Sequence, residues 1–173
     1  MVILLSIQLT IAVIFIFLAY KFSDWKNWRS YYSTMIFFAF GDLVYRFLFE
    51  DKQLWIQYSI YFTEKQIELI WILAIYPSTV LLFLTFYLKQ KTIKNCIYNL
   101  LFWIIGYSIL ELVLYKLGRF IYKNGWNYWW SVGFYFFMFP ILVLHHYKPL
   151  WALWVSAVCG IIMMLIFKGT IVV

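Results

Sequence analysis

Ionisable side chains within long apolar stretches are the feature that most limits how this chain can fold. Six stretches are apolar for long enough to cross a lipid bilayer, and Asp42, Arg46 and Glu111 lie within them. A charge at the centre of a bilayer costs about 2.5–3.5 kcal/mol on insertion scales, so such residues are expected to face one another or a wet cavity. The sequence therefore predicts a helical bundle with a polar interior.

The composition supports a membrane protein. Of the 173 residues, 66% are hydrophobic and 12% are charged, against about 25% charged in soluble domains. We expect an all-α membrane protein, a bundle of about six transmembrane helices with short loops, forming one polytopic domain over residues 1–173. The predicted spans are residues 2–20, 32–49, 66–88, 96–118, 127–144 and 150–167.

The basic residues indicate lipid as the partner. The net charge is +7, but the basic side chains lie in loops between apolar stretches and form no groove for nucleic acid. We expect contact with anionic lipid headgroups, and no cofactor or metal, because no Cys/His spacing matches a zinc site. The basic loops at Lys21–Arg29 and Lys89–Lys94 are predicted to be cytoplasmic, with both termini outside.

Two groups of tryptophans flank predicted spans. Trp25 and Trp28 follow the first span, and Trp126, Trp129 and Trp130 stand at the start of the fifth. Tryptophan is enriched at the level of lipid headgroups, so these residues are predicted to anchor the helix ends at the membrane interface. In an alternative reading, the face around Trp25 and Trp28 binds a peptide or a partner protein.

Asp42 and Arg46 are one helical turn apart in the second predicted span. Side chains at this spacing share a face, so we expect an ion pair that lowers the cost of burying either charge. Two interpretations remain open. The pair is a structural brace, or it forms part of a site for an ion, a proton or an anionic headgroup.

Glu111 has no basic neighbour on its own helix face, because the nearest one, Lys116, is five positions on. It therefore needs a partner from another helix, or a proton. Hydrogen bonding to Tyr107 or Tyr115 would make it structural. A stripe at four-residue spacing is expected to face protein: Asn99, Trp103, Tyr107, Glu111 and Tyr115.

Two further groups of ionisable residues lie near predicted span ends. Glu64 and Glu68 are expected to be a solvated helix start. His145 and His146 are adjacent, hence about 100° apart on a helix, and cannot chelate one metal together without a third ligand. We expect them in a headgroup-level cluster with Lys148 and with Arg119, or simply at a polar helix end.

Prolines and small residues bear on helix packing. Pro77 and Pro140 each remove one backbone hydrogen bond and predict kinks. Ala152, Ser156 and Gly160 form a ridge of small residues that would let another helix approach closely.

The chain resembles a family of small multi-pass proteins from Gram-positive, often spore-forming bacteria, which has no assigned activity. The motifs that carry the resemblance are Asp24–Trp28, Tyr31–Tyr32, Gly41–Asp42 with Tyr45, Tyr76–Thr79, Asn124–Asn127 with Trp129–Ser131, and Met138–Pro140 with His145–His146 and Lys148–Leu150. The resemblance implies a bacterial plasma membrane and emphasises Asp42 and the two histidines. It supplies no substrate.

Three classes of function are compatible with the sequence. The leading hypothesis is a non-enzymatic membrane protein whose polar site binds or transports an ion, a proton, a small solute or a lipid headgroup, using Asp42, Arg46, Glu111 and His145 or His146. The second is a structural subunit that binds another membrane protein or a second copy of itself. A lipid-modifying enzyme ranks last, because no nucleophile and base stand at usable spacing.

Overall fold

Seven helices and two short strands make up residues 7–167, the part of the chain that the computed structural model describes. In chain order they are α1 (Ile7–Phe22), a 3-10 segment (Trp25–Ser30), α2 (Tyr32–Leu48), a 3-10 turn (Glu50–Lys52), β1 (Trp55–Gln57), α3 (Glu64–Ile70), a π-helical turn (Trp71–Ile75), α4 (Tyr76–Leu88), α5 (Ile93–Lys116), β2 (Phe120–Tyr122), α6 (Tyr128–Tyr147) and α7 (Pro149–Phe167).

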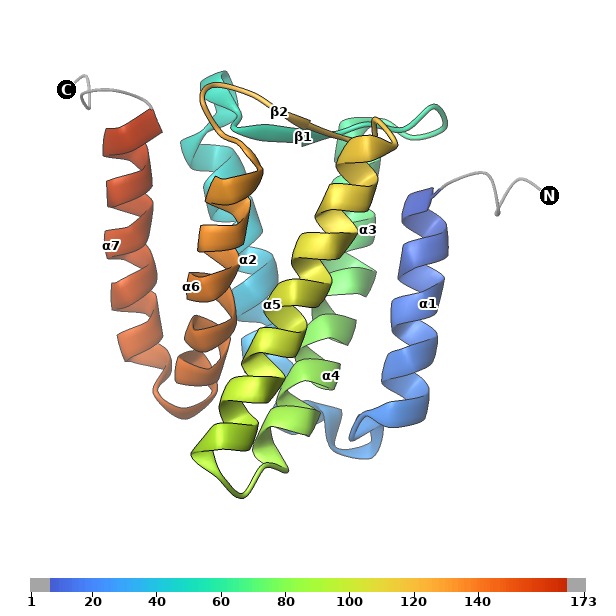
Figure 1. Cartoon of the computed structure of the whole chain (residues 1–173), viewed down its shortest axis with the longest axis vertical. Coiled ribbons are helices and arrows are strands. Elements are labelled where there is room, and N and C mark those ends of the chain that lie inside the picture. The colour runs from blue at the N-terminus through green and yellow to red at the C-terminus, as the bar shows by residue number, and fades with distance from the viewer. Residues whose placement is uncertain (1–6, 168–173) are drawn as a thin grey trace.

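The helices run up and down alongside one another (Figure 1). Because α3, the π-helical turn and α4 form one continuous helix, the bundle has six helical rods. The α4 segment is central and packs against α1, α2 and α5, whereas α7 is peripheral and packs mainly against α6. The strands lie at the end of the bundle where α1 begins and α7 ends (Figure 1).

Four helices are long and apolar enough to cross a membrane: Glu64–Leu88, Ile93–Lys116, Tyr128–Tyr147 and Pro149–Phe167. These correspond to the last four of the six predicted spans, and by length and composition each of them is able to cross a membrane. The first predicted span includes residues 2–6, which lie outside the described residues. Its described part, α1, is a shorter apolar helix, and α2 has 17 residues.

The predicted all-α bundle is confirmed as a mainly helical fold, and the structure adds a short two-stranded sheet at one end of the bundle. β1 and β2 pair antiparallel, with Trp55 opposite Tyr122. Three residues with positive φ let the chain turn back after α5 and again after β2, namely Gly118 (φ 67°), Asn124 (φ 52°) and Gly125 (φ 87°). The connection from α5 to α6, which contains β2, can therefore meet the connection from α2 to α3, which contains β1. The sequence of neither connection predicts this sheet alone.

Pro77 lies in a continuous helix that contains a π-helical turn just before it. Tyr76 donates its backbone N–H to the carbonyl of Trp71, five residues earlier, which is the π-helical pattern. Such a turn accommodates one extra residue just before the proline, which has no N–H to donate. The wider turn helps place the ring of Tyr76 against Phe38 of α2, with centroids 4.4 Å apart.

Candidate functional site

A cavity of about 640 Å³ lies among α2, α5, α6 and α7, bordered by residues of β1 and β2. Its wall is mostly apolar. Asp42 from α2 and Glu111 from α5 both line it, although they are far apart in the sequence. Among the described residues, no lysine, arginine or histidine lines this cavity. Three of the predicted site residues, Asp42, Tyr107 and Glu111, therefore line one cavity.

Glu111 is 5% exposed and is held by two phenols. Tyr122 of β2 donates its hydroxyl to Oε1 at 2.6 Å, and Tyr135 of α6 donates to Oε2. Ser131 of α6 interacts with the same carboxyl group. Glu111 therefore joins α5 to α6 and β2 by hydrogen bonds to neutral groups.

Tyr107 and Tyr115, which the sequence suggested as hydrogen-bond partners of Glu111, bind other groups instead. The Tyr107 hydroxyl is shared with Thr79 of α4 instead. Tyr115 is 44% exposed and its ring contacts Tyr122, with centroids 4.9 Å apart. A spacing of four residues drifts around a helix, so the stripe on α5 faces protein at Tyr107 and Glu111 but not at Tyr115.

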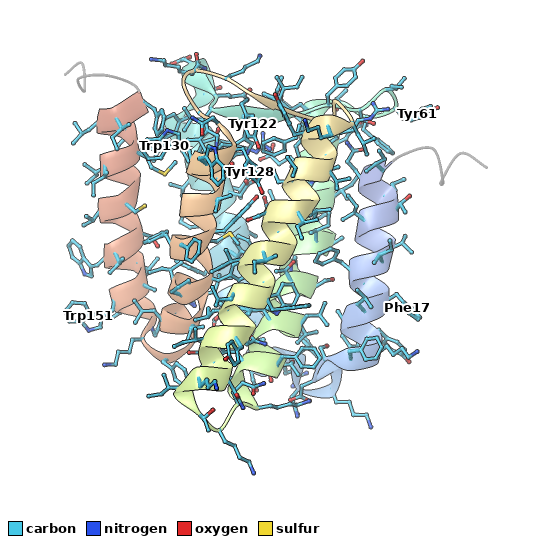
Figure 2. The ribbon with its side chains drawn as sticks, in the orientation of Figure 1. Phe17, Tyr61, Tyr122, Tyr128, Trp130 and Trp151 are labelled. Carbon is cyan, nitrogen blue, oxygen red and sulfur yellow. The ribbon has the colours of Figure 1, made fainter. Side chains whose placement is uncertain are left out.

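Tyr122 lies at the β2 end of the bundle (Figure 2). Burial raises the pKa of this phenol above its ordinary value, and the carboxyl of Glu111 raises it further by accepting its hydrogen bond. The phenol therefore keeps its proton at neutral pH and remains a donor. Phe120, Ile121 and Tyr122 are residue types that favour strands, which is the signal in the sequence for β2.

The ion pair predicted between Asp42 and Arg46 is present. Arg46 donates from Nε to Oδ2 of Asp42 at 3.3 Å, and the Tyr76 hydroxyl donates to Oδ1 at 3.1 Å. Asp42 is thus fixed by its own helix and by the residue that follows the π-helical turn. The spacing on α2 indicated the first contact, and nothing in the sequence indicated the second.

Arg46 also binds both glutamates of α3, so the prediction of a solvated helix start is wrong for Glu68. Nε of Arg46 is 2.8 Å from Glu68 Oε1, and Nη1 is 3.5 Å from Glu64 Oε1. The Glu68 side chain is only 14% exposed, whereas that of Glu64 is 37% exposed. These ion pairs join α2 to α3, and the sequence of either helix alone does not show them.

Arg46 lies between the large apolar cavity and a second, polar pocket. It lines this polar pocket of about 490 Å³ with Glu50, Glu64, Lys65 and Glu68. Asp42, its partner, lines the large apolar cavity. The ion pair therefore separates a charged pocket at the β1 end of α2 from the cavity inside the bundle.

The two histidines lie outside this site. Nδ1 of His145 is 3.1 Å from Oγ1 of Thr34, and its ring stacks on Phe37. His146 stacks on Tyr31. Arg119, expected near them, contacts the ring of Tyr58, because it follows the end of α5, and α5 and α6 end at opposite ends of the bundle (Figure 1). The histidines therefore join the end of α6 to α2, and the expected cluster with Arg119 is wrong.

Four of the five predicted tryptophan anchors are exposed at the ends of the bundle. Trp25 and Trp28 lie beside the connection from α1 to α2, and Trp129 and Trp130 lie at the β2 end (Figure 2). Trp126 is 6% exposed and donates Nε1–H to the Ser131 hydroxyl at 2.8 Å. The anchor prediction is wrong for Trp126, because the turn before α6 packs its ring against Trp55 of β1 and Phe167 of α7.

The ridge of small residues on α7 leaves space instead of receiving a helix. Ala152 is buried, but Ser156 and Gly160 line the large cavity. The nearest side-chain atom facing Gly160 belongs to Leu48 of α2. The small side chains at Ser156 and Gly160 therefore leave room for the cavity between α2 and α7.

No protein-family model, curated protein or solved structure matches this chain. What the site can do follows from its own groups. Within residues 7–167, no group of three or more His, Cys, Asp or Glu side chains is placed to hold a metal ion. The cavity instead offers carboxyl oxygens, phenol hydroxyls and a large apolar wall, which are groups that bind an amphipathic molecule.

Proposed function

We propose that this chain is a multi-pass protein of a bacterial plasma membrane that binds an amphipathic small molecule or lipid headgroup inside its helical bundle. In this proposal α1 and α2 cross the membrane with the four longer helices, giving six spans. The polar part of the ligand contacts Asp42 and Glu111, and its apolar part lies against α6 and α7.

The observation that carries this proposal is the convergence of Asp42 and Glu111 on one cavity of about 640 Å³. This volume falls in the range of about 300–1,000 Å³ that is usual for small-molecule sites. A mostly apolar wall with a few placed polar groups suits an amphipathic ligand better than a bare ion, which needs several oxygen ligands around it.

Photo-crosslinking tests the proposal directly. The purified protein in lipid nanodiscs is exposed to a long-chain alcohol carrying a diazirine, and labelled peptides are mapped by mass spectrometry. We expect labelling to concentrate on the cavity-lining residues of α2, α6 and α7 and to compete with unlabelled alcohol. Labelling spread evenly over lipid-facing residues, with no competition, would contradict the proposal.

A matched pair of variants sharpens this experiment. Ser156→Phe places a ring in the cavity, whereas Val158→Phe places the same ring on an exposed face of α7 that does not line it. We expect Ser156→Phe to reduce labelling several-fold and Val158→Phe to leave it unchanged. Equal labelling of both variants would show that the probe does not enter the cavity.

Transport is the more specific version of the proposal. It is tested in liposomes by comparing flux in the wild type with flux in Asp42→Asn and Glu111→Gln. A structural subunit is the second candidate. The observation that supports it is that both carboxyl groups already have protein partners. In that case Asp42→Asn lowers the folded yield, while the photolabelling of each folded molecule stays unchanged.

A further inference from the structure

The two carboxyl groups in the cavity differ in how their charge is balanced. Asp42 has Arg46 as a partner. Glu111 is bonded to the neutral hydroxyls of Tyr122 and Tyr135 and also interacts with the neutral hydroxyl of Ser131, and among the described residues no basic side chain lines the cavity. Each oxygen of Glu111 has a donor, so the carboxylate is satisfied in hydrogen bonds but not in charge. A buried carboxylate in this condition is stabilised by a proton or by a cation, and a cation that enters the cavity competes with the proton for it.

The wall around this carboxyl group suits an organic cation. Tyr107 and Tyr135 meet edge to face with ring centroids 5.6 Å apart. Trp126, whose Nε1–H donates to Ser131, also contributes its ring, and all of these residues line the cavity. Aromatic rings attract cations through their negative faces, and they also provide apolar contact for the groups that carry the charge.

An anionic ligand would meet the opposite conditions. Its charge would lie in the same cavity as Asp42 and Glu111, with no basic side chain from the lining to compensate. Like charges within a site of low polarity repel strongly. The electrostatics of the lining therefore discriminate by the sign of the ligand charge.

We propose that the cavity binds a lipophilic organic cation, an ammonium or phosphonium group attached to apolar substituents, with Glu111 as its counter-charge. This inference rests on the proposed function, because it assumes that an amphipathic molecule enters the cavity. It goes further by assigning the charge of the ligand and the residue that recognises it.

Two ions of similar size and opposite charge test the inference. Binding of tetraphenylphosphonium and of tetraphenylborate is measured with the full chain in nanodiscs of zwitterionic phosphatidylcholine, and uptake by empty nanodiscs is subtracted. We expect saturable binding of tetraphenylphosphonium, at least about tenfold tighter than that of tetraphenylborate, which corresponds to about 1.4 kcal/mol. This comparison uses the wild type and needs no variant to fold.

Variants then locate the recognition. Glu111→Gln keeps the shape of the side chain and removes its charge, so it is expected to weaken tetraphenylphosphonium binding about tenfold or more and to leave tetraphenylborate unchanged or bound more tightly. Tyr115→Phe, on the same helix but outside the cavity, is the control and is expected to bind as the wild type does. Thermal unfolding shows whether each variant is folded.

The outcomes separate the two proposals. Equal affinity for both ions, or unchanged phosphonium binding in Glu111→Gln, overturns the assignment of a cation, and the proposed function stands if Ser156→Phe still blocks the neutral alcohol probe. If Ser156→Phe changes the binding of no probe, the cavity is not a ligand site and both proposals are wrong.

Discussion

Glu111 joins three elements, because its carboxyl on α5 accepts hydrogen bonds from Tyr122 on β2 and Tyr135 on α6. A hydrogen bond to a charged group contributes about 1.5–3 kcal/mol, and a buried partner left without its bond costs a similar amount. The contacts of this one side chain therefore bear both on ligand recognition and on the position of β2 over the bundle.

Tyr135→Phe removes one of these bonds and nothing else. We expect the free energy of unfolding to fall by about 1.5–3 kcal/mol, because one oxygen of the buried carboxyl group loses its donor. Tyr115→Phe is the matched control and is expected to change stability by less than about 0.5 kcal/mol, since this tyrosine is exposed. Reversible unfolding in detergent measures both, and equal stability of the two variants would contradict the role of Tyr135.

The stability lost in Tyr122→Phe should depend on pH. Because the pKa of Tyr122 is raised in the folded protein, the folded state retains its phenol proton at a pH where the unfolded chain loses it. The stabilisation is therefore complete below about pH 10, the ordinary value for tyrosine, and is lost as the pH rises above it. We expect the difference in melting temperature between wild type and Tyr122→Phe to shrink from pH 8 to pH 11. A constant difference would show that Tyr122 titrates normally.

At the scale of elements, Arg46 connects α2 to α3 through Glu64 and Glu68 while it pairs with Asp42 on its own helix. One guanidinium thus serves three carboxylates, two of them from the neighbouring element. Removing one member of a largely buried ionic network leaves the other charges without compensation. The resulting loss of stability is larger than the stability that the intact network adds over apolar packing at the same place.

Arg46→Gln is therefore expected to destabilise the fold by about 3 kcal/mol, near the lower end for breaking a buried pair. Lys65→Gln makes the same change of charge at an exposed position of the same pocket, and its expected effect is below about 1 kcal/mol. Melting temperature and the yield of monodisperse protein measure the two variants. A loss in Lys65→Gln as large as that in Arg46→Gln would assign the effect to net charge rather than to the network.

Local patterns predicted the helices well and their contacts poorly. Long apolar stretches predict helices such as Ile93–Lys116, because in a membrane the backbone must satisfy its own hydrogen bonds. The pairing of Trp55 with Tyr122 depends on two connections meeting in space. The π-helical turn at Trp71–Ile75 depends on how its helix packs, and the proline alone indicated only a disturbance.

The contacts of the candidate site also fall into two groups, those that the sequence predicts and those that it does not. The contact of Asp42 with Arg46 lies within one helix, so the spacing of four residues was enough to predict it. The bonds of Tyr76 to Asp42 and of Tyr135 to Glu111 join different helices, and spacing along the chain carries no information about them. Burial of an ionisable residue can be inferred from sequence, but the identity of its partner requires the tertiary arrangement.

At the scale of the whole molecule, the six antiparallel rods gather the connections at two ends with different charge. The end that holds the connections from α1 to α2, from α4 to α5 and from α6 to α7 (Figure 1) carries these charged residues: Lys21, Asp24, Lys26, Arg29, Lys89, Lys91, Lys94 and Lys148. Asp24 is the single acidic residue among them. The other end carries both acidic and basic residues: Glu50, Asp51 and Glu64 lie there together with Lys52, Lys65, Arg119 and Lys123.

This asymmetry predicts the orientation of the bundle. Basic residues in short connections favour the cytoplasmic side, so the end with β1 and β2 is expected to face outward. The site then lies nearer the outer face, because Asp42 and Glu111 are in the halves of α2 and α5 that adjoin the strands. A ligand would reach the cavity from that side of the membrane or from its outer leaflet.

Single cysteines test both the orientation and the number of spans. Cys96 and Cys159 are first replaced by serine, and one cysteine is then introduced at Lys26, Asp51, Lys91 or Lys123, which lie in four different connections. A membrane-impermeant maleimide applied to intact cells is expected to label the variants at Asp51 and Lys123, and to label those at Lys26 and Lys91 only after permeabilisation. The control for folding is equal labelling of all four variants in detergent. Labelling of Lys26 and Asp51 from the same side would mean that α2 does not cross the membrane, whereas full reversal of the pattern would keep six spans and turn the cavity toward the cytoplasm.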